Sequence, residues 1–352
     1  MQRKNIYHMS LVLMGVFVFS ANAYAEGEDL ESRVKAIEEK LESSPPKKTI
    51  FEDVKVGGYI QAYYGWFEDD NVDDTFEIRR AFVALSGKIQ SDVAFKVQVD
   101  AAASSNILRD GWIKYSGLPW AVITLGQFKI PFSHEQITGA SKLDTIERSR
   151  VATALSYGRD LGLMLEGDVV DEALLYAVAI VNGTGRNTAD SNDSKDVVGR
   201  VVVAPFKFKR GDNAFGDLRA GVSFQTGRQA PSGTDEGSRN RCGALLMYAY
   251  ENFEMKSEYI FQDMEQTDGS SRYSDGWYIT GMYRVNDLLQ GLARFERYDP
   301  NREVEGDMED VLTLGANIFP AKVFLIQANY RRKTEAPGVA NDEFLLQAQV
   351  KF

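Results

Sequence analysis

From residue 54 onward, apolar and polar residues alternate along most of this chain with a period of two. In VLTLGANIF (311–319), every second residue from Leu312 to Ile318 is apolar. This period predicts β-strands with one apolar and one polar face. We predict sixteen strands, near residues 54–66, 76–89, 92–102, 108–117, 120–130, 158–170, 172–183, 196–206, 216–228, 240–251, 253–265, 273–286, 289–299, 308–319, 321–333 and 341–352.

The connections between these segments alternate in length. Odd-numbered connections are mostly long and polar, as in FEDDNVDDT (67–75), and even-numbered ones are mostly tight, as in Gln90-Ser91. One even-numbered connection, KFKRGDNAFG (207–216), is an exception, because it is longer than the other even-numbered ones. Short turns on one side of a membrane and long loops on the other are typical of outer-membrane barrels. The chain is therefore predicted to be all-β, a 16-stranded antiparallel transmembrane β-barrel.

The chain closes on FLLQAQVKF (344–352), in which only Leu345 breaks the alternation. We expect its apolar residues to face lipid, and its two glutamines and Lys351 to face water inside the barrel. The last strand would pair with the first, near residues 54–66, so that the sheet has no open edge.

Aromatic residues cluster at the predicted strand ends, where girdles lie at the membrane interfaces of barrels. The girdle candidates are Tyr59, Tyr63, Tyr64, Trp66, Trp112, Tyr115, Trp120, Trp277, Tyr283, Tyr298 and Tyr330.

The first 53 residues do not follow this pattern. A basic start, an apolar stretch (11–21) and an Ala-x-Ala site ending at Ala25 predict a secretory signal peptide over residues 1–25. Residues 26–53 are charged and begin with apolar residues at heptad spacing, which predicts a short periplasmic helical or coiled-coil segment and linker. An amphipathic tail is the alternative, because about two heptads are marginal for an isolated helix. The barrel domain would span residues 54–352.

Composition narrows the class of protein. The net charge is −11, which becomes −13 when Arg3 and Lys4 leave with the predicted signal peptide, so we expect no nucleic-acid binding. The single cysteine, Cys242, cannot form an internal disulfide, so a closed hydrogen-bonded sheet would stabilise the chain instead. Cys242 and His134, the one histidine after residue 25, form no ligand cluster, so we predict neither a metal nor a cofactor.

With apolar residues outward, the polar residues of each strand point into the barrel, where their charges need water or a partner. The basic members of this inward set are Lys96, Lys114, Lys129, Arg200, Lys256, Arg284, Arg294 and Arg331. The acidic members are Asp100, Asp110, Asp160, Glu166, Glu258 and Glu296. Eight basic against six acidic residues is a slight positive excess. The presence of so many inward charges predicts a water-filled bore.

The connection from Pro131 to Tyr157 is too long for a passive turn. It carries Lys142, Arg148 and Arg150 together with three acidic residues. In a barrel of sixteen strands, such a loop can fold inward and narrow the bore.

Several stretches resemble the phosphate-selective porin family of the O and P type, among them EIRRAFVALSGKI, GQFKIPFS, GRDLGLMLEG and DVVGRVVVAPF. The resemblance runs from about residue 54 to residue 352 and is densest from 76 to 206. It implies a homotrimeric outer-membrane channel of a Gram-negative bacterium, narrowed by its third outer loop, for small anions such as phosphate or polyphosphate. It also implies contacts with outer-membrane lipid and lipopolysaccharide, and it makes Phe352 part of the signal read by the barrel-assembly machinery.

The sequence and this resemblance together nominate nine residues for lining the pore or binding anions. They are Lys96, Lys114, Lys129, Lys142, Arg148, Arg150, Arg200, Arg284 and Arg294. Phe82 departs from the family pattern, because it occupies an inward position where a basic residue is expected. Phosphate specificity is therefore open, and a general or weakly selective diffusion porin is the alternative.

Two other classes of protein are weighed against a channel. A hydrolase needs a nucleophile beside a positioned base, but Ser133 and His134 are neighbours at a strand end and point apart, so we predict no catalytic residues. An adhesive surface protein would use the acidic residues of the long loops, whose simpler interpretation is a solvated surface.

Overall fold

The computed structural model describes residue 35 and residues 52–169, 173–190, 192–206, 216–229, 237–265, 269–335, 338 and 340–352. The chain divides into residues 1–50 and residues 51–352. In the first unit Lys35 is helical; the predicted signal peptide and the rest of the predicted helical segment lie outside the described residues. Within the described part of the chain, no helix has both the length and the apolar composition to span a membrane.

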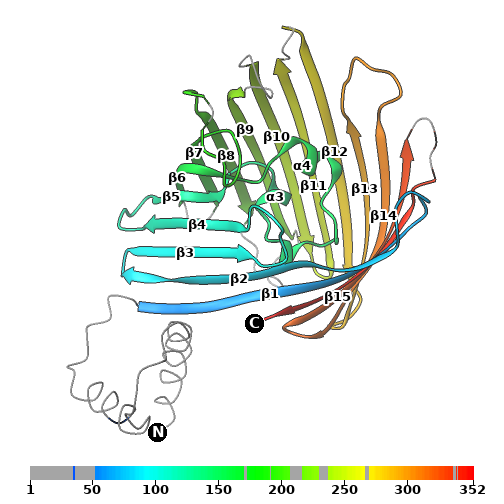
Figure 1. The fold of residues 1–352 in the computed structure, drawn as a ribbon, viewed down its shortest axis with the longest axis horizontal. Coiled ribbons are helices and arrows are strands. Elements are labelled where there is room, and N and C mark those ends of the chain that lie inside the picture. The colour runs from blue at the N-terminus through cyan, green and yellow to red at the C-terminus, as the bar shows by residue number, and fades with distance from the viewer. Residues whose placement is uncertain are drawn as a thin grey trace, which may run out of the picture. The chain divides into compact units, whose positions relative to one another are not determined.

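The second unit contains sixteen antiparallel strands that form a closed barrel (Figure 1). Each strand pairs with its neighbours in sequence, and the first pairs with the last, so all sixteen predicted strands are confirmed. The strands are β1 (Glu52–Phe67), β2 (Thr75–Gln90), β3 (Val93–Asp100), β4 (Leu108–Tyr115), β5 (Val122–Lys129), β6 (Arg159–Val169), β7 (Leu174–Val181), β8 (Asp196–Phe206), β9 (Asp217–Gln229), β10 (Gly237–Tyr250), β11 (Phe253–Glu265), β12 (Ser271–Arg284), β13 (Leu289–Asp299), β14 (Glu309–Ala321), β15 (Phe324–Glu335) and β16 (Glu343–Lys351).

The outward face of the barrel carries the apolar residues that the alternation predicted. On β14, Leu312 and Leu314 are 40% and 50% exposed, whereas Thr313 between them is 2% exposed. Aliphatic side chains exposed along strand after strand are suited to a lipid environment, since a soluble protein rarely exposes a large continuous apolar surface.

The predicted aromatic girdle is confirmed only in part. Exposed members of the set are Trp66, Tyr115, Trp120, Tyr283 and Tyr330. The prediction is wrong for residues that lie inside the barrel, namely Tyr59, Tyr63, Trp112 and Tyr298. These inner rings pack against cations or against the loop that fills part of the bore, and alternation alone could not distinguish such packing from an interfacial position.

The last strand closes the sheet as expected, but its inner face is not wet. Residues Tyr59–Phe67 of β1 pair with residues Glu343–Lys351 of β16. Gln347 and Gln349 are each 1% exposed, so the expectation that they face water is wrong. Leu345, which broke the alternation, points inward and packs with Ile146.

The segment that covers these residues is the connection between β5 and β6, residues 130–158, which we call the inner loop. It contains α3 (His134–Ile137), η1 (Ala140–Lys142) and α4 (Arg150–Leu155). Ser133 and Ser149 cap the two α-helices by accepting hydrogen bonds from backbone N–H groups. The loop lies inside the ring of strands, with α4 packed on β11, β12 and β13 (Figure 1). The predicted inward fold of this connection is therefore what the structure shows.

Candidate functional site

Amide side chains of the barrel wall hold the middle of the inner loop. Gln61, on β1, donates a hydrogen bond to the carbonyl oxygen of Ala140 at 3.3 Å. Gln327, on β15, donates to the carbonyl oxygens of Leu143 and Asp144 at 3.2 and 3.1 Å. Further amide contacts to the loop come from Asn317, Asn329 and Gln349. Because buried carbonyl groups need partners, these amides fix the path of the loop across the bore.

Charged groups anchor the start of the inner loop. Glu258, on β11, accepts hydrogen bonds from the Ser133 hydroxyl at 3.0 Å and from the His134 backbone N–H at 2.7 Å. Glu135, in α3, forms a buried ion pair with Arg294 on β13 at 2.7 Å. Both ions are almost fully enclosed, so removing either partner would leave an uncompensated buried charge.

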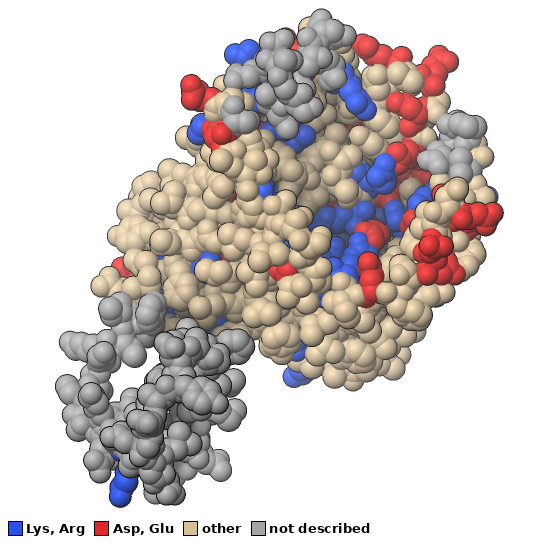
Figure 2. Space-filling model, in the orientation of Figure 1, with Lys and Arg blue, Asp and Glu red and all other residues tan. Residues whose placement is uncertain are grey.

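The opposite wall leaves an open passage beside the loop. No hydrogen bond or ion pair between described residues joins the inner loop to β3 or β4, whereas many join it to β11 and to β13–β16. Figure 2 shows Lys and Arg side chains gathered in the central hollow, with Asp and Glu side chains along one side of the opening. The passage therefore borders the wall formed by β2–β6, whose strand β2 still contacts the loop through the Arg79–Glu147 pair.

Two β-bulges each add an arginine to this wall. The register shift between β1 and β2 leaves Arg79 as the extra residue, and the shift between β3 and β4 leaves Arg109. A bulge re-aims the side chain of the extra residue. Arg79 pairs with Glu147 of the inner loop, and Arg109 pairs with Asp100 at 2.6 Å. The Arg109 guanidinium also lies over the ring of Phe82, at 5.4 Å, so β4, two strands away from β2, supplies a cation where the sequence lacks one.

We call six side chains around this passage the cationic cluster: Arg79, Arg80, Lys96, Arg109, Arg148 and Arg159. Ion pairs engage four of them, with three carboxylates: Arg79 with Glu147, Arg109 with Asp100, and both Lys96 and Arg159 with Asp110. The cluster is continuous around Tyr59, whose electrostatic neighbours include Arg80, Arg148 and Arg159.

Arg80 and Arg148 form no ion pair among the described residues. Arg80 donates to the Gln61 side-chain oxygen at 2.9 Å, and Arg148 donates to the carbonyl oxygens of Glu135 and Thr138 at 3.1 and 3.0 Å. Burial lowers the pKa of Arg148 below its ordinary value, and the charge of Arg159 acts in the same direction. Each guanidinium has five N–H groups, so both keep donors that a solute anion could use.

The structure distributes the nine predicted residues over several settings. Ion pairs engage four of them: Lys96 with Asp110, Lys114 with Glu166, Arg150 with Glu309 and Arg294 with Glu135. Lys129 donates to three backbone carbonyls at the end of α3, at 2.8 to 3.1 Å, which uses all its N–H groups. Lys142 is exposed on the loop, Arg200 contacts His134, and Arg284, the last residue of β12, lies over the ring of Phe319.

Four members of the cationic cluster were not among the nine predicted residues. Arg79 and Arg109 sit at bulges, which break the period that assigned inward positions. Arg159 is the first residue of β6, where alternation has not yet fixed a direction. Arg80 was recoverable, because it shares the inward phase of Phe82 and its Arg-Arg context is visible in the sequence.

The side chains of Ser133 and His134 engage different partners, as the sequence predicted. Ser133 contacts Glu258, whereas the Nδ1 atom of His134 faces Arg200 at 3.4 Å. Burial, followed by the charge of Arg200, lowers the pKa of His134 to about 4. Among the described residues, no group of three or more His, Cys, Asp or Glu side chains could hold a metal ion.

Comparison with known proteins identifies the family. The family described as phosphate-selective porin O and P matches residues 54–352. Porin O of Pseudomonas aeruginosa is 24% identical over 201 residues, which are 53% of this chain and 44% of porin O, so the match spans less than half of that relative.

Solved structures share the fold. An anion-selective porin from Comamonas acidovorans has a TM-score of 0.64 and 11% identity, with 85% of this chain and 99% of that chain covered. OmpT of Vibrio cholerae in its trimer form has a TM-score of 0.62 and 11% identity, with the same coverage. Family and fold are those of a channel rather than an enzyme. The chain belongs to the phosphate-selective porin O and P family, and it is an outer-membrane porin.

Proposed function

We propose that the barrel is a water-filled channel for small anions, and that its selectivity arises in the cationic cluster. The observation that carries this proposal is that six cations line one passage beside the inner loop and share three carboxylates as ion-pair partners among the described residues. A passage lined by one sign of charge raises the local concentration of the opposite ion. The four paired cations set the positive electrostatic potential of the passage. Arg80 and Arg148 supply free N–H donors for direct contact with the solute anion.

Planar-bilayer recording tests this proposal. The full chain is reconstituted in a KCl gradient and the reversal potential is measured, and we expect chloride to be preferred over potassium. Arg80→Gln and Arg148→Gln should each lower the chloride-to-potassium permeability ratio several-fold, since one charge at ~5–10 Å contributes on the order of 1 kcal/mol at effective dielectric constants of 20 to 80. The matched control is Arg297→Gln, because Arg297 is paired with Asp310 outside the inward phase of β13. A wild-type channel without anion preference would overturn the proposal.

Phosphate and polyphosphate are the solutes we propose within this anion class, in keeping with the family's description. The alternative function is a weakly selective anion porin. It is favoured because four cations of the cluster already have carboxylate partners. Block of the chloride current by phosphate discriminates the two. Block at millimolar phosphate that is lost in Arg80→Gln supports specificity, whereas additive conduction of both ions supports the weakly selective porin.

We also propose that the channel is a homotrimer whose apolar outer face contacts outer-membrane lipid and lipopolysaccharide. OmpT of Vibrio cholerae, which shares the fold, is described in a trimer form. Conductance steps in threes would support the trimer.

Phe352 is proposed as an assembly signal, since its exposed ring is accessible at the end of the closing strand. Deleting Phe352 should reduce the amount of assembled barrel much more than the conductance of the channels that do assemble.

A further inference from the structure

Part of the inward face of β5–β10 is apolar, which is unexpected for a wet bore. Inward positions of a water-filled barrel are usually polar. Here Met164 lies opposite Thr124 and Ala179, and Leu245 lies opposite Gly221 and Glu258, all in the inward phase. An apolar wall inside a channel needs a cover or an occupant, because exposed apolar surface is unfavourable in water.

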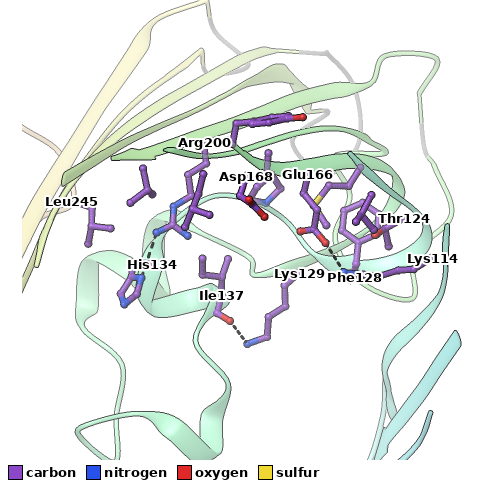
Figure 3. A pocket seen from close by; sticks show the side chains of 18 of the residues that line it. Lys114, Thr124, Phe128, Lys129, His134, Ile137, Glu166, Asp168, Arg200 and Leu245 are labelled. Atoms are coloured by element: carbon purple, nitrogen blue, oxygen red, sulfur yellow. Dashed lines mark hydrogen bonds and ion pairs between the residues drawn. The ribbon is translucent and has the colours of Figure 1, made fainter. Parts of the chain in front are cut away.

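The inner loop covers only part of this wall. Phe132, Val151 and Leu155 of the loop pack into the apolar core with Met164 and Val198. The remainder lines an open cavity of about 700 Å³ between the start of the loop and β4–β10 (Figure 3). We call it the wall pocket, and its apolar lining includes Phe128, Ile137, Met164, Leu175, Val202 and Leu245.

One cation in the wall pocket has a neutral partner. Arg200, on β8, reaches over the pocket toward His134 (Figure 3), and that contact is its one hydrogen bond among the described residues. The lowered pKa of His134 keeps its ring neutral at neutral pH, so the ring does not compensate the charge of Arg200. The Glu258 carboxyl acts on Arg200 through space but forms no ion pair with it among the described residues. The other basic residues are engaged: Lys114 by Glu166, Lys129 by α3 carbonyls and Arg219 by Asp217.

We propose that the wall pocket binds a small organic anion with an apolar body, such as an aromatic carboxylate. The carboxylate would pair with the Arg200 guanidinium, whose planar fork matches a carboxylate, and the ring would lie against Met164 and Leu245. The volume falls within the range of small-molecule sites, about 300–1,000 Å³. Inorganic phosphate has no apolar surface to bury, so it would gain nothing from this lining. The inference rests on the proposed passage of anions through the bore.

Blocking experiments on the reconstituted full chain test the wall pocket. The probes are benzoate, acetate, which has the same carboxylate without a ring, and benzamide, which has the ring without a charge. Benzoate should interrupt the chloride current at a concentration about tenfold or more below that of acetate, because a partly buried ring adds apolar contact. Benzamide should block more weakly than benzoate, because it cannot pair with Arg200.

Two substitutions separate the parts of the site. Arg200→Gln should weaken the block by benzoate, and Leu245→Asn should weaken it while retaining the cation. Arg297→Gln, on the outward face of β13, is the control for a lost arginine. If either pocket variant does not fold, the other variant and the wild-type comparison of benzoate with acetate still show whether the wall pocket binds the organic anion.

The outcomes distinguish this inference from the proposed function. Equal block by benzoate and acetate in an anion-preferring wild-type channel overturns the wall pocket and leaves the proposed function intact. Absence of anion preference, measured by reversal potential without benzoate, overturns the proposed function instead. Block by benzoate that persists unchanged in both Arg200→Gln and Leu245→Asn places the organic anion elsewhere and overturns the wall pocket.

Discussion

At the scale of single residues, the passage is defined by arginines whose direction depends on local breaks in the strands. Arg79 and Arg109 reach the bore because each is the extra residue of a bulge. Arg79 then meets Glu147 of the inner loop, and Arg109 meets Asp100. A bulge thus places a second side chain on the inward face where regular alternation would send it to lipid.

The Arg79–Glu147 pair predicts a response to acid. Burial alone would raise the pKa of Glu147, but the hydrogen bond and charge of Arg79 outweigh it and hold this pKa below its ordinary value. A carboxyl with a lowered pKa contributes stability that is complete above its unfolded pKa of about 4.3 and is lost as pH falls through the folded pKa. We therefore expect open-channel current noise to rise below about pH 4, as the loop loses this contact.

Two variants check this acid response. Glu147→Gln should show raised noise already at neutral pH and little further change in acid, while Glu305→Gln, at an exposed outer-loop carboxylate, should behave like wild type. The interpretation fails if Glu147→Gln retains the full acid response of the wild-type channel.

At the scale of elements, the inner loop behaves as part of the barrel core rather than as a mobile lid. Amides from β1 and β14–β16 hold its middle, and carboxylates and arginines hold its ends. Its helices α3 and α4 are too short to be stable alone, so these tertiary contacts maintain them. The loop thereby divides the lumen into a packed half and an open half.

Removing one amide should loosen the loop. Gln327→Leu removes the donor to the carbonyls of Leu143 and Asp144, and Asn317 still bonds that of Asp144. The carbonyl of Leu143 loses its Gln327 donor, and a buried group left unpaired costs about 1–3 kcal/mol. We expect noisier channels and faster cleavage by trypsin after Lys142, which is exposed on the loop. Asn240→Leu is the control, because Asn240 bonds Thr226 on the outward face. Wild-type noise and wild-type resistance to trypsin in Gln327→Leu would refute this role of the amide.

At the scale of the whole molecule, closure depends on close contact between the first and last strands. The N–H of Gly58 donates to the carbonyl of Phe352 at 2.9 Å, and the N–H of Phe352 donates back at 3.1 Å. A Cβ at Gly58 would lie 2.1 Å from the carbonyl oxygen of Phe82 and 2.8 Å from the Phe352 ring. The seam therefore has room for glycine alone at this position.

Gly58→Ala should lower the yield of folded barrel severalfold, because a backbone oxygen at 2.1 Å cannot move aside without opening the β1–β2 ladder. The measurement is the fraction of chain that migrates as folded barrel on gel electrophoresis without boiling. Gly291→Ala is the matched control, since a Cβ there meets nothing within 4 Å. Equal folded fractions for the two variants would contradict this account of the seam.

The sequence by itself determined the sixteen strands, the outward apolar residues, the sorting of long and short connections and the closure of β16 on β1. Those features follow from a local period of two, with an apolar outer face and a mostly polar inner face. Tertiary structure alone decided which inward cations remain free for a solute. Arg294 and Lys129 are held by the inner loop, Gln347 and Gln349 are buried beneath it, and Arg79 and Arg109 enter the bore through bulges. The physical reason is that these outcomes depend on contacts between distant segments and on single-residue register shifts, which a local period does not encode.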